Sequence, residues 1–134
     1  MKRVSIFGLM VFFMALASGA LASQTIELTF EWEQPEADFP NLREWGLYIM
    51  DTSGGVQHSP IVIPYVSGAG PFQATSSFTV TGAPGATVRR YFVLDAVSKN
   101  GTRSENSNEV FYDFVMPSAD VTVPIKLKVT VTIK

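Results

Sequence analysis

Residues 91–115 read YFVLDAVSKNGTRSENSNEVFYDFV, and this stretch decides the fold class. Two apolar runs, 91–97 and 109–115, flank a polar loop that contains Gly101. Short apolar runs separated by a glycine-bearing polar connection are typical of two paired β-strands. From residue 23 onward, apolar residues nowhere recur at helical spacing over three turns. The sequence therefore predicts an all-β chain.

The rest of the chain repeats this pattern. Residues 26–32 alternate Ile, Leu, Phe and Trp against Glu, Thr and Glu, and residues 45–50 and 76–82 form further short runs. Residues 61–66 read IVIPYV, and the proline favours an edge strand because it cannot donate a ladder hydrogen bond. About seven strands at this spacing predict an immunoglobulin-like β-sandwich, in which each of two sheets buries one face.

The N-terminus has the layout of a secretory signal peptide. Lys2 and Arg3 precede an uncharged apolar run, and Ala20-Leu21-Ala22 forms an A-x-A cleavage site before Ser23. The alternative is an uncleaved membrane anchor, since about 20 apolar residues span a bilayer. We expect a signal peptide over 1–22, a β-sandwich over 23–117 and a C-terminal strand extension over 118–134. The protein would then be secreted, periplasmic or on the cell surface.

Composition excludes several partners and functions. Without Lys2 and Arg3, eight basic residues stand against twelve acidic ones, which is a net charge of −4. Nucleic-acid binding needs clustered basic charge, so neither nucleic acid nor an anionic membrane surface is an expected partner after signal removal. The chain has no cysteine, so its core alone must hold an exported domain together.

The stretch 91–110 resembles the sixth and last strands of a fibronectin type III domain in its bacterial form. LTFEWEQP, residues 28–35, resembles the second strand of that family, with Trp32 at the position of the core tryptophan. NLREWGLYIM and FTVTGAPG resemble the third strand and the fifth strand with its turn. The resemblance implies that the strands over 45–50, 91–97 and 110–115 are neighbours in the larger sheet. It also implies a spacer, adhesive or assembly role.

The chain departs from this family in two places. Arg90 stands where the family usually has a corner tyrosine, with Tyr91 beside it. In addition, only SQTIE, residues 23–27, precedes Leu28 in the mature chain, which is too short for the family's first strand and its turn. The mature protein is therefore expected to lack that first strand.

The C-terminal segment VTVPIKLKVTVTIK, residues 121–134, resembles such a first strand and is the candidate assembly strand. Its odd positions are all apolar: Val121, Val123, Ile125, Leu127, Val129, Val131 and Ile133. Burying seven such side chains would stabilise the protein by on the order of 10 kcal/mol, before the entropy cost of ordering the segment is subtracted. We therefore expect the segment to pair with a sheet.

Three arrangements of this segment remain open. It could form a hairpin with the strand over 109–115, fill the vacant first-strand position of its own domain, or fill that position in a neighbouring molecule. Self-insertion in the usual direction must cover about 20 Å. The eight residues 116–123 can span about 27 Å, so that connection would be nearly taut.

Little in the sequence points to catalysis. His58 is the only histidine and lies in a polar turn, no cysteine nucleophile exists, and there is no Gly-x-Ser-x-Gly motif. Glu27, Glu31 and Glu33 share one strand face but are expected to be solvated. We therefore predict a non-enzymatic protein without cofactor or metal, and a hydrolase is the weakest alternative.

A candidate binding face comes from the residues that alternate with the core positions. If Trp45 and Leu47 face inward, then Tyr48 and Met50 face outward, and the same alternation places Tyr91, Val93 and Phe111 outside. Such an apolar-aromatic patch often contacts protein or carbohydrate. The alternative is that aromatic residues simply favour strands and that a loop or the C-terminal segment covers them.

These observations predict an exported binding or assembly module. Its C-terminal strand would complete its own sheet or that of a neighbour, so the expected partner is a protein or a second copy of the chain. The alternative is a carbohydrate- or protein-binding accessory module that uses the candidate binding face.

Overall fold

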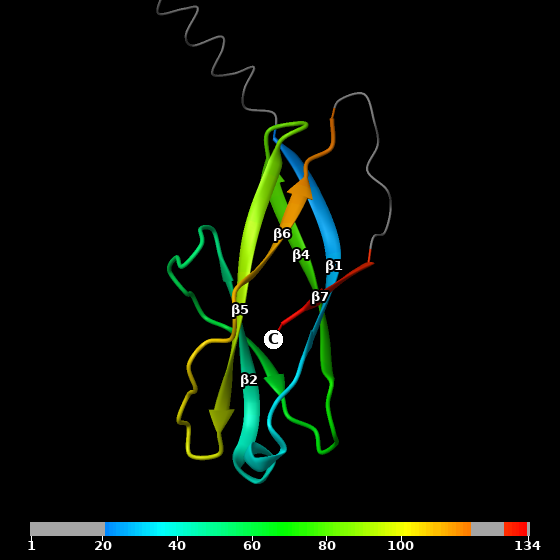
Figure 1. Ribbon diagram of the computed structural model, residues 1–134. Helices are drawn as coiled ribbons and strands as arrows, with labels where there is room; N and C mark the ends of the chain where they lie inside the picture. Colours follow the sequence, from blue (N-terminus) through cyan, green and yellow to red (C-terminus); the bar gives the residue numbers. More distant parts are fainter. Residues whose placement is uncertain (1–20, 119–127, 134) are drawn as a thin grey trace, which may run out of the picture.

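The computed structural model describes residues 21–118 and 128–133, which form an all-β sandwich of two facing sheets (Figure 1). The strands are β1 (Ala22–Trp32), β2 (Leu42–Met50), β3 (Ile61–Pro64), β4 (Phe72–Gly82), β5 (Thr87–Ser98), β6 (Val110–Val115) and β7 (Lys128–Thr132). One short 3-10 helix, η1 (Glu36–Asn41), lies between β1 and β2, where Pro35 and Pro40 interrupt the strand pattern. The predicted fold class is confirmed.

The smaller sheet has the strand order β4-β1-β7. β1 pairs antiparallel with β4 along its whole length, from Ala22 opposite Gly82 to Trp32 opposite Phe72. The alternation predicted for residues 26–32 holds, because Ile26, Leu28, Phe30 and Trp32 are all buried in the core. The opposite face is polar, and Thr29 and Thr75 there share a hydrogen bond of 2.8 Å between their hydroxyl groups.

The larger sheet has the order β3-β2-β5-β6. The three strands expected to be neighbours, β2, β5 and β6, lie side by side, and the proline-marked β3 is at the sheet edge as predicted. Trp45 and Leu47 of β2 and Phe92 and Leu94 of β5 face the smaller sheet and are buried. The inward and outward sides of β2 and β5 follow the predicted alternation.

The core between the sheets is rich in aromatic rings. Phe30 packs against Phe78 and Phe92, with ring centroids 6.0 and 5.1 Å apart. Toward the η1 end, Trp32 and Trp45 meet edge to face at 5.1 Å. Each fully buried ring or aliphatic chain stabilises the fold by about 1.5–3 kcal/mol. Because the chain has no cysteine, this packing replaces covalent cross-links.

Candidate functional site

The C-terminal strand β7 lies along the edge of β1 in the same chain (Figure 1). The pairing is parallel and runs from Glu27 opposite Lys128 to Glu31 opposite Thr132. It continues one residue further, where the backbone N–H of Ile133 donates to the carbonyl oxygen of Glu31 at 2.7 Å. β7 therefore closes the smaller sheet on the side opposite β4.

Three of the seven apolar residues of the candidate assembly strand lie in the described part of the chain. Val129 and Val131 pack partly buried against the core, and Ile133 is buried at 2% exposure. Lys128, Thr130 and Thr132 on the other face are exposed. The predicted alternation holds over these residues. Val121, Val123, Ile125 and Leu127 lie outside the described residues.

Of the three arrangements considered, residues 128–132 adopt self-insertion, but in the direction opposite to the one assumed. Within the described residues β6 pairs only with β5, so β7 is not its hairpin partner. The geometry explains the parallel direction. Val115 at the end of β6 lies opposite Thr87, and a short turn joins Thr87 to Gly82, the partner of Ala22. β6 therefore ends where β1 begins, and a parallel strand requires no return along the sandwich.

The candidate binding face points away from the core as predicted, but most of it is not exposed. Tyr48, Met50 and Val93 are buried and form a second apolar cluster on the outer side of the larger sheet, with Tyr91 packed partly buried against it. Only Phe111 is well exposed, at 53%. Of the two alternatives considered for these residues, the covered arrangement holds for Tyr48, Met50 and Val93 and the exposed one for Phe111. Strand alternation could not decide between them, because it assigns a side to each residue and cannot show what covers that side.

Two loops cover this outer cluster. Glu109 fastens the loop after β2, since its carboxylate accepts hydrogen bonds from the hydroxyl of Ser53 at 2.5 Å and the backbone N–H of Gly54 at 2.8 Å. These bonds, chiefly the one from Ser53, lower the pKa of Glu109 below its ordinary value. The turn over residues 52–55 is thereby held beside Met50 and Val93.

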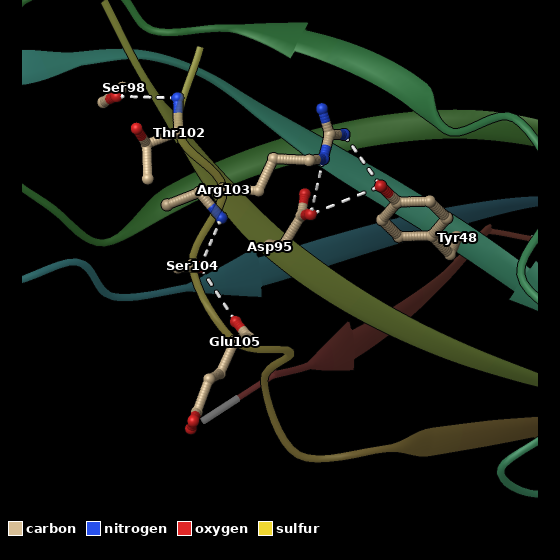
Figure 2. A network of polar contacts seen from close by, with 8 residues as sticks. Tyr48, Asp95, Ser98, Thr102, Arg103, Ser104 and Glu105 are labelled. Atoms are coloured by element: carbon tan, nitrogen blue, oxygen red, sulfur yellow. Dashed lines mark hydrogen bonds and ion pairs between the residues drawn. The ribbon is translucent and has the colours of Figure 1, made fainter. Parts of the chain in front are cut away.

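The second covering loop is the loop after β5, and a polar network holds it against the sheet (Figure 2). Arg103 donates from Nε to Asp95 Oδ2 at 2.9 Å and from Nη2 to the hydroxyl of Tyr48 at 2.7 Å. Asp95 is 5% exposed, so the guanidinium group neutralises a buried carboxylate. A Cβ at Gly46 would lie 2.7 Å from Asp95 Oδ1, which explains why glycine occupies that position.

The same loop takes the position of a neighbouring strand beside the C-terminal half of β5. Ser107 accepts from the backbone N–H of Leu94 at 2.9 Å through its hydroxyl, and its own N–H donates to the Leu94 carbonyl at 2.7 Å. Ser104 repeats this pair of bonds with Ala96. Sequence analysis missed these residues; the Ser-x-x-Ser spacing within an otherwise polar loop was the available signal.

Phe111 remains as the exposed end of the predicted face. The guanidinium carbon of Arg89 lies 3.9 Å from the Phe111 ring centroid, and Arg89 also forms two hydrogen bonds to Asp113, at 2.6 and 2.9 Å. The Arg89 contact lowers the pKa of Asp113. Val115, on the same side of β6, is 59% exposed.

The sequence offered His58, Glu27, Glu31 and Glu33 as candidates for catalysis or metal binding. His58 is exposed in the loop between β2 and β3, and no group of three or more metal-ligating side chains occurs in residues 21–118 and 128–133. Glu27 and Glu31 are partly buried and Glu33 is exposed. No helix in this part of the chain is long and apolar enough to cross a membrane.

Comparison with known proteins gives no relative: no family model, no curated protein and no solved structure matches the chain.

Proposed function

We propose that the chain is an exported, non-enzymatic, fibronectin type III-like assembly module whose C-terminal strand β7 exchanges between copies. In the single molecule β7 completes its own sheet. In an assembly, β7 of one molecule occupies the β1 edge of the next and makes the same contacts there. The module would act in the periplasm or at the cell surface.

The observation that carries this proposal is the way β7 is attached. Among the described residues, its backbone pairs with one strand, β1, over five residues, and its end is anchored by the buried Ile133. β1 pairs with β4 over eleven residues, so within residues 21–118 and 128–133 β7 is the less extensively paired neighbour of β1. Parallel pairing is also slightly less stable per residue than antiparallel pairing. An element held in this way exchanges at low cost, because every contact is regained in the partner.

The test is size-exclusion chromatography with light scattering over a range of concentrations. The chain is compared with a version that ends at Pro117 and therefore lacks the exchanging strand. We expect the longer protein to form dimers or higher assemblies as concentration rises, and the shorter one to stay monomeric and to unfold at lower denaturant. If the longer protein stays monomeric at every concentration, the proposal fails, whatever the stability of the shorter one.

A second candidate function is protein binding at the β6 edge, and the exposure of Phe111 and Val115 favours it. Exposed aromatic residues beside an arginine are common in interface centres. Phe111→Ala should then abolish pull-down of envelope protein without lowering stability, whereas Tyr48→Ala should lower stability because Tyr48 is buried. Unchanged pull-down by Phe111→Ala would dismiss this candidate.

A further inference from the structure

Asn100 and Gly101 lie in an exposed turn at the end of β5; we call residues 98–102 the tip turn. Lys99, Asn100 and Gly101 form its loop, and the glycine has a φ of 89°, in the left-handed region that a hairpin loop of this length requires. The backbone N–H of Ser98 donates to the carbonyl oxygen of Thr102 at 2.8 Å and joins the two ends of the turn. Among the chain's asparagines, only Asn100 precedes a glycine.

An asparagine before a glycine carries both groups of an intramolecular reaction. The backbone nitrogen of Gly101 can attack the side-chain carbon Cγ of Asn100, and the glycine has no side chain to hinder the attack. A bond then forms between these two atoms, the Cγ–Nδ2 bond breaks, and ammonia leaves with the proton of the Gly101 nitrogen. Water opens the resulting succinimide ring at either of its carbonyl carbons, which gives aspartate or isoaspartate at position 100.

In the folded chain both reacting groups are held by hydrogen bonds. The N–H of Gly101 donates to the carbonyl oxygen of Ser98 at 2.9 Å. Asn100 Oδ1 accepts from the backbone N–H of Thr102 at 3.0 Å and from the Ser98 hydroxyl. The same Thr102 N–H also donates to the Ser98 hydroxyl oxygen at 3.1 Å (Figure 2). Ring closure requires the Gly101 nitrogen to give up its proton and the carboxamide to turn toward it, so the tip turn must open before the reaction.

The two products differ in whether the tip turn can form again. Aspartate keeps the side-chain oxygen that accepts the hydrogen bonds of the turn. Isoaspartate inserts one extra carbon into the backbone, which a loop of this length does not accommodate. The bridge between Val97 and Arg103 follows directly after the turn, and Arg103 donates to Asp95 and Tyr48 from there. A lengthened backbone therefore moves Arg103 away from these partners.

From these contacts we propose that Asn100 is a self-modification site that the folded tip turn keeps closed, and that its conversion to isoaspartate releases the loop after β5 from the outer cluster. Each hydrogen bond of the turn favours the closed form by about two- to tenfold, so the bonds together protect Asn100. The reaction occurs when the loop opens, and its products accumulate with each opening. This inference rests neither on strand exchange nor on export.

Peptide mapping by mass spectrometry measures the conversion of Asn100 at mildly alkaline pH, with and without denaturing guanidinium chloride. We expect conversion in the folded chain to be at least about tenfold slower than in the denatured chain. Equal rates in the two states overturn the proposal, and so does an absence of conversion in the denatured chain.

Two serine variants test whether the turn provides the protection. Ser98→Ala removes the hydroxyl that contacts both Asn100 and Thr102, so the folded-state rate should rise by about three- to tenfold while the denatured-state rate stays the same. The matched Ser77→Ala, at an exposed site in β4, should change neither rate. A folded Ser98→Ala variant that converts no faster than the unmodified chain overturns the proposal.

Two forms of identical composition and charge test the release of the loop. The isoaspartate form is isolated after ageing in denaturant and refolding, and Asn100→Asp supplies the aspartate form with a normal backbone. We expect Asn100→Asp to unfold at the same denaturant concentration as the unmodified chain. The isoaspartate form should unfold at a lower one and show shifted NMR signals of Tyr48 and Arg103. An isoaspartate form as stable as Asn100→Asp, with these signals unchanged, would refute the release.

Discussion

Ile133 donates its backbone N–H to the carbonyl oxygen of Glu31 at 2.7 Å, and its side chain is buried at 2% exposure. This contact fixes the end of β7 against β1 and seals the core beside Trp32. Ile133→Ala should lower the free energy of unfolding by about 2–4 kcal/mol, as other large-to-small core substitutions do. Thr132→Ala, on the exposed face, should change it by less than about 0.5 kcal/mol.

Urea unfolding of the two variants checks this prediction. Equal midpoints for Ile133→Ala and the unmodified chain would mean that β7 is not anchored by Ile133.

Arg103 neutralises the buried carboxylate of Asp95, and this relationship can be tested by removing one or both partners. Arg103→Met leaves the charge of Asp95 buried with only the Tyr48 hydroxyl as a hydrogen-bond partner, at 3.3 Å. It should therefore destabilise the chain more than the double variant Asp95→Asn with Arg103→Met, which removes the charge as well. Thermal unfolding of the single and double variants measures the difference. A double variant less stable than Arg103→Met would contradict this account of the network.

Glu109 should make the turn over residues 52–55 sensitive to acid. Hydrogen bonds from Ser53 and Gly54 lower the pKa of Glu109 in the folded state, below the ordinary value of 4.5. The contribution of this clamp to stability is therefore complete above that value and is lost as the pH falls through the lowered folded-state pKa.

NMR can follow the amide signal of Gly54 against pH. We expect a transition with its midpoint below 4.5 in the unmodified chain, and none in Glu109→Gln. A midpoint at or above the ordinary value would show that the clamp does not form in solution.

The sequence predicted the layers of the fold because its strands alternate cleanly. Ile26, Leu28, Phe30 and Trp32 face one way in the sequence pattern and lie together in the core. The edge position of β3 followed from its proline. These features are local, so the residues of one strand are enough to predict them.

What escaped prediction depends on long-range contacts. Alternation placed Tyr48 and Val93 on the outer side of the larger sheet. It could not reveal that Arg103 and Glu109, both in the loop after β5, hold two loops against that side through hydrogen bonds. The parallel direction of β7 depends on the end of the sandwich at which β6 finishes, and that is a property of the assembled sheets.

Strand exchange, the central claim, is tested most directly by a disulfide between β1 and β7. The chain has no cysteine, and Glu27 and Lys128 are paired residues on the accessible face of the smaller sheet. Neighbouring strands lie about 4.8 Å apart, within the Cα separation that a disulfide tolerates. Glu27→Cys with Lys128→Cys is oxidised at low and at high protein concentration and examined by non-reducing electrophoresis. Thr79→Cys with Lys128→Cys serves as a control that should not cross-link, because β1 separates the two strands.

The account predicts cross-linked monomers at low concentration and a ladder of covalent dimers and higher species at high concentration. Cross-linked monomers alone at every concentration would show that β7 stays in its own molecule and would contradict assembly by strand exchange.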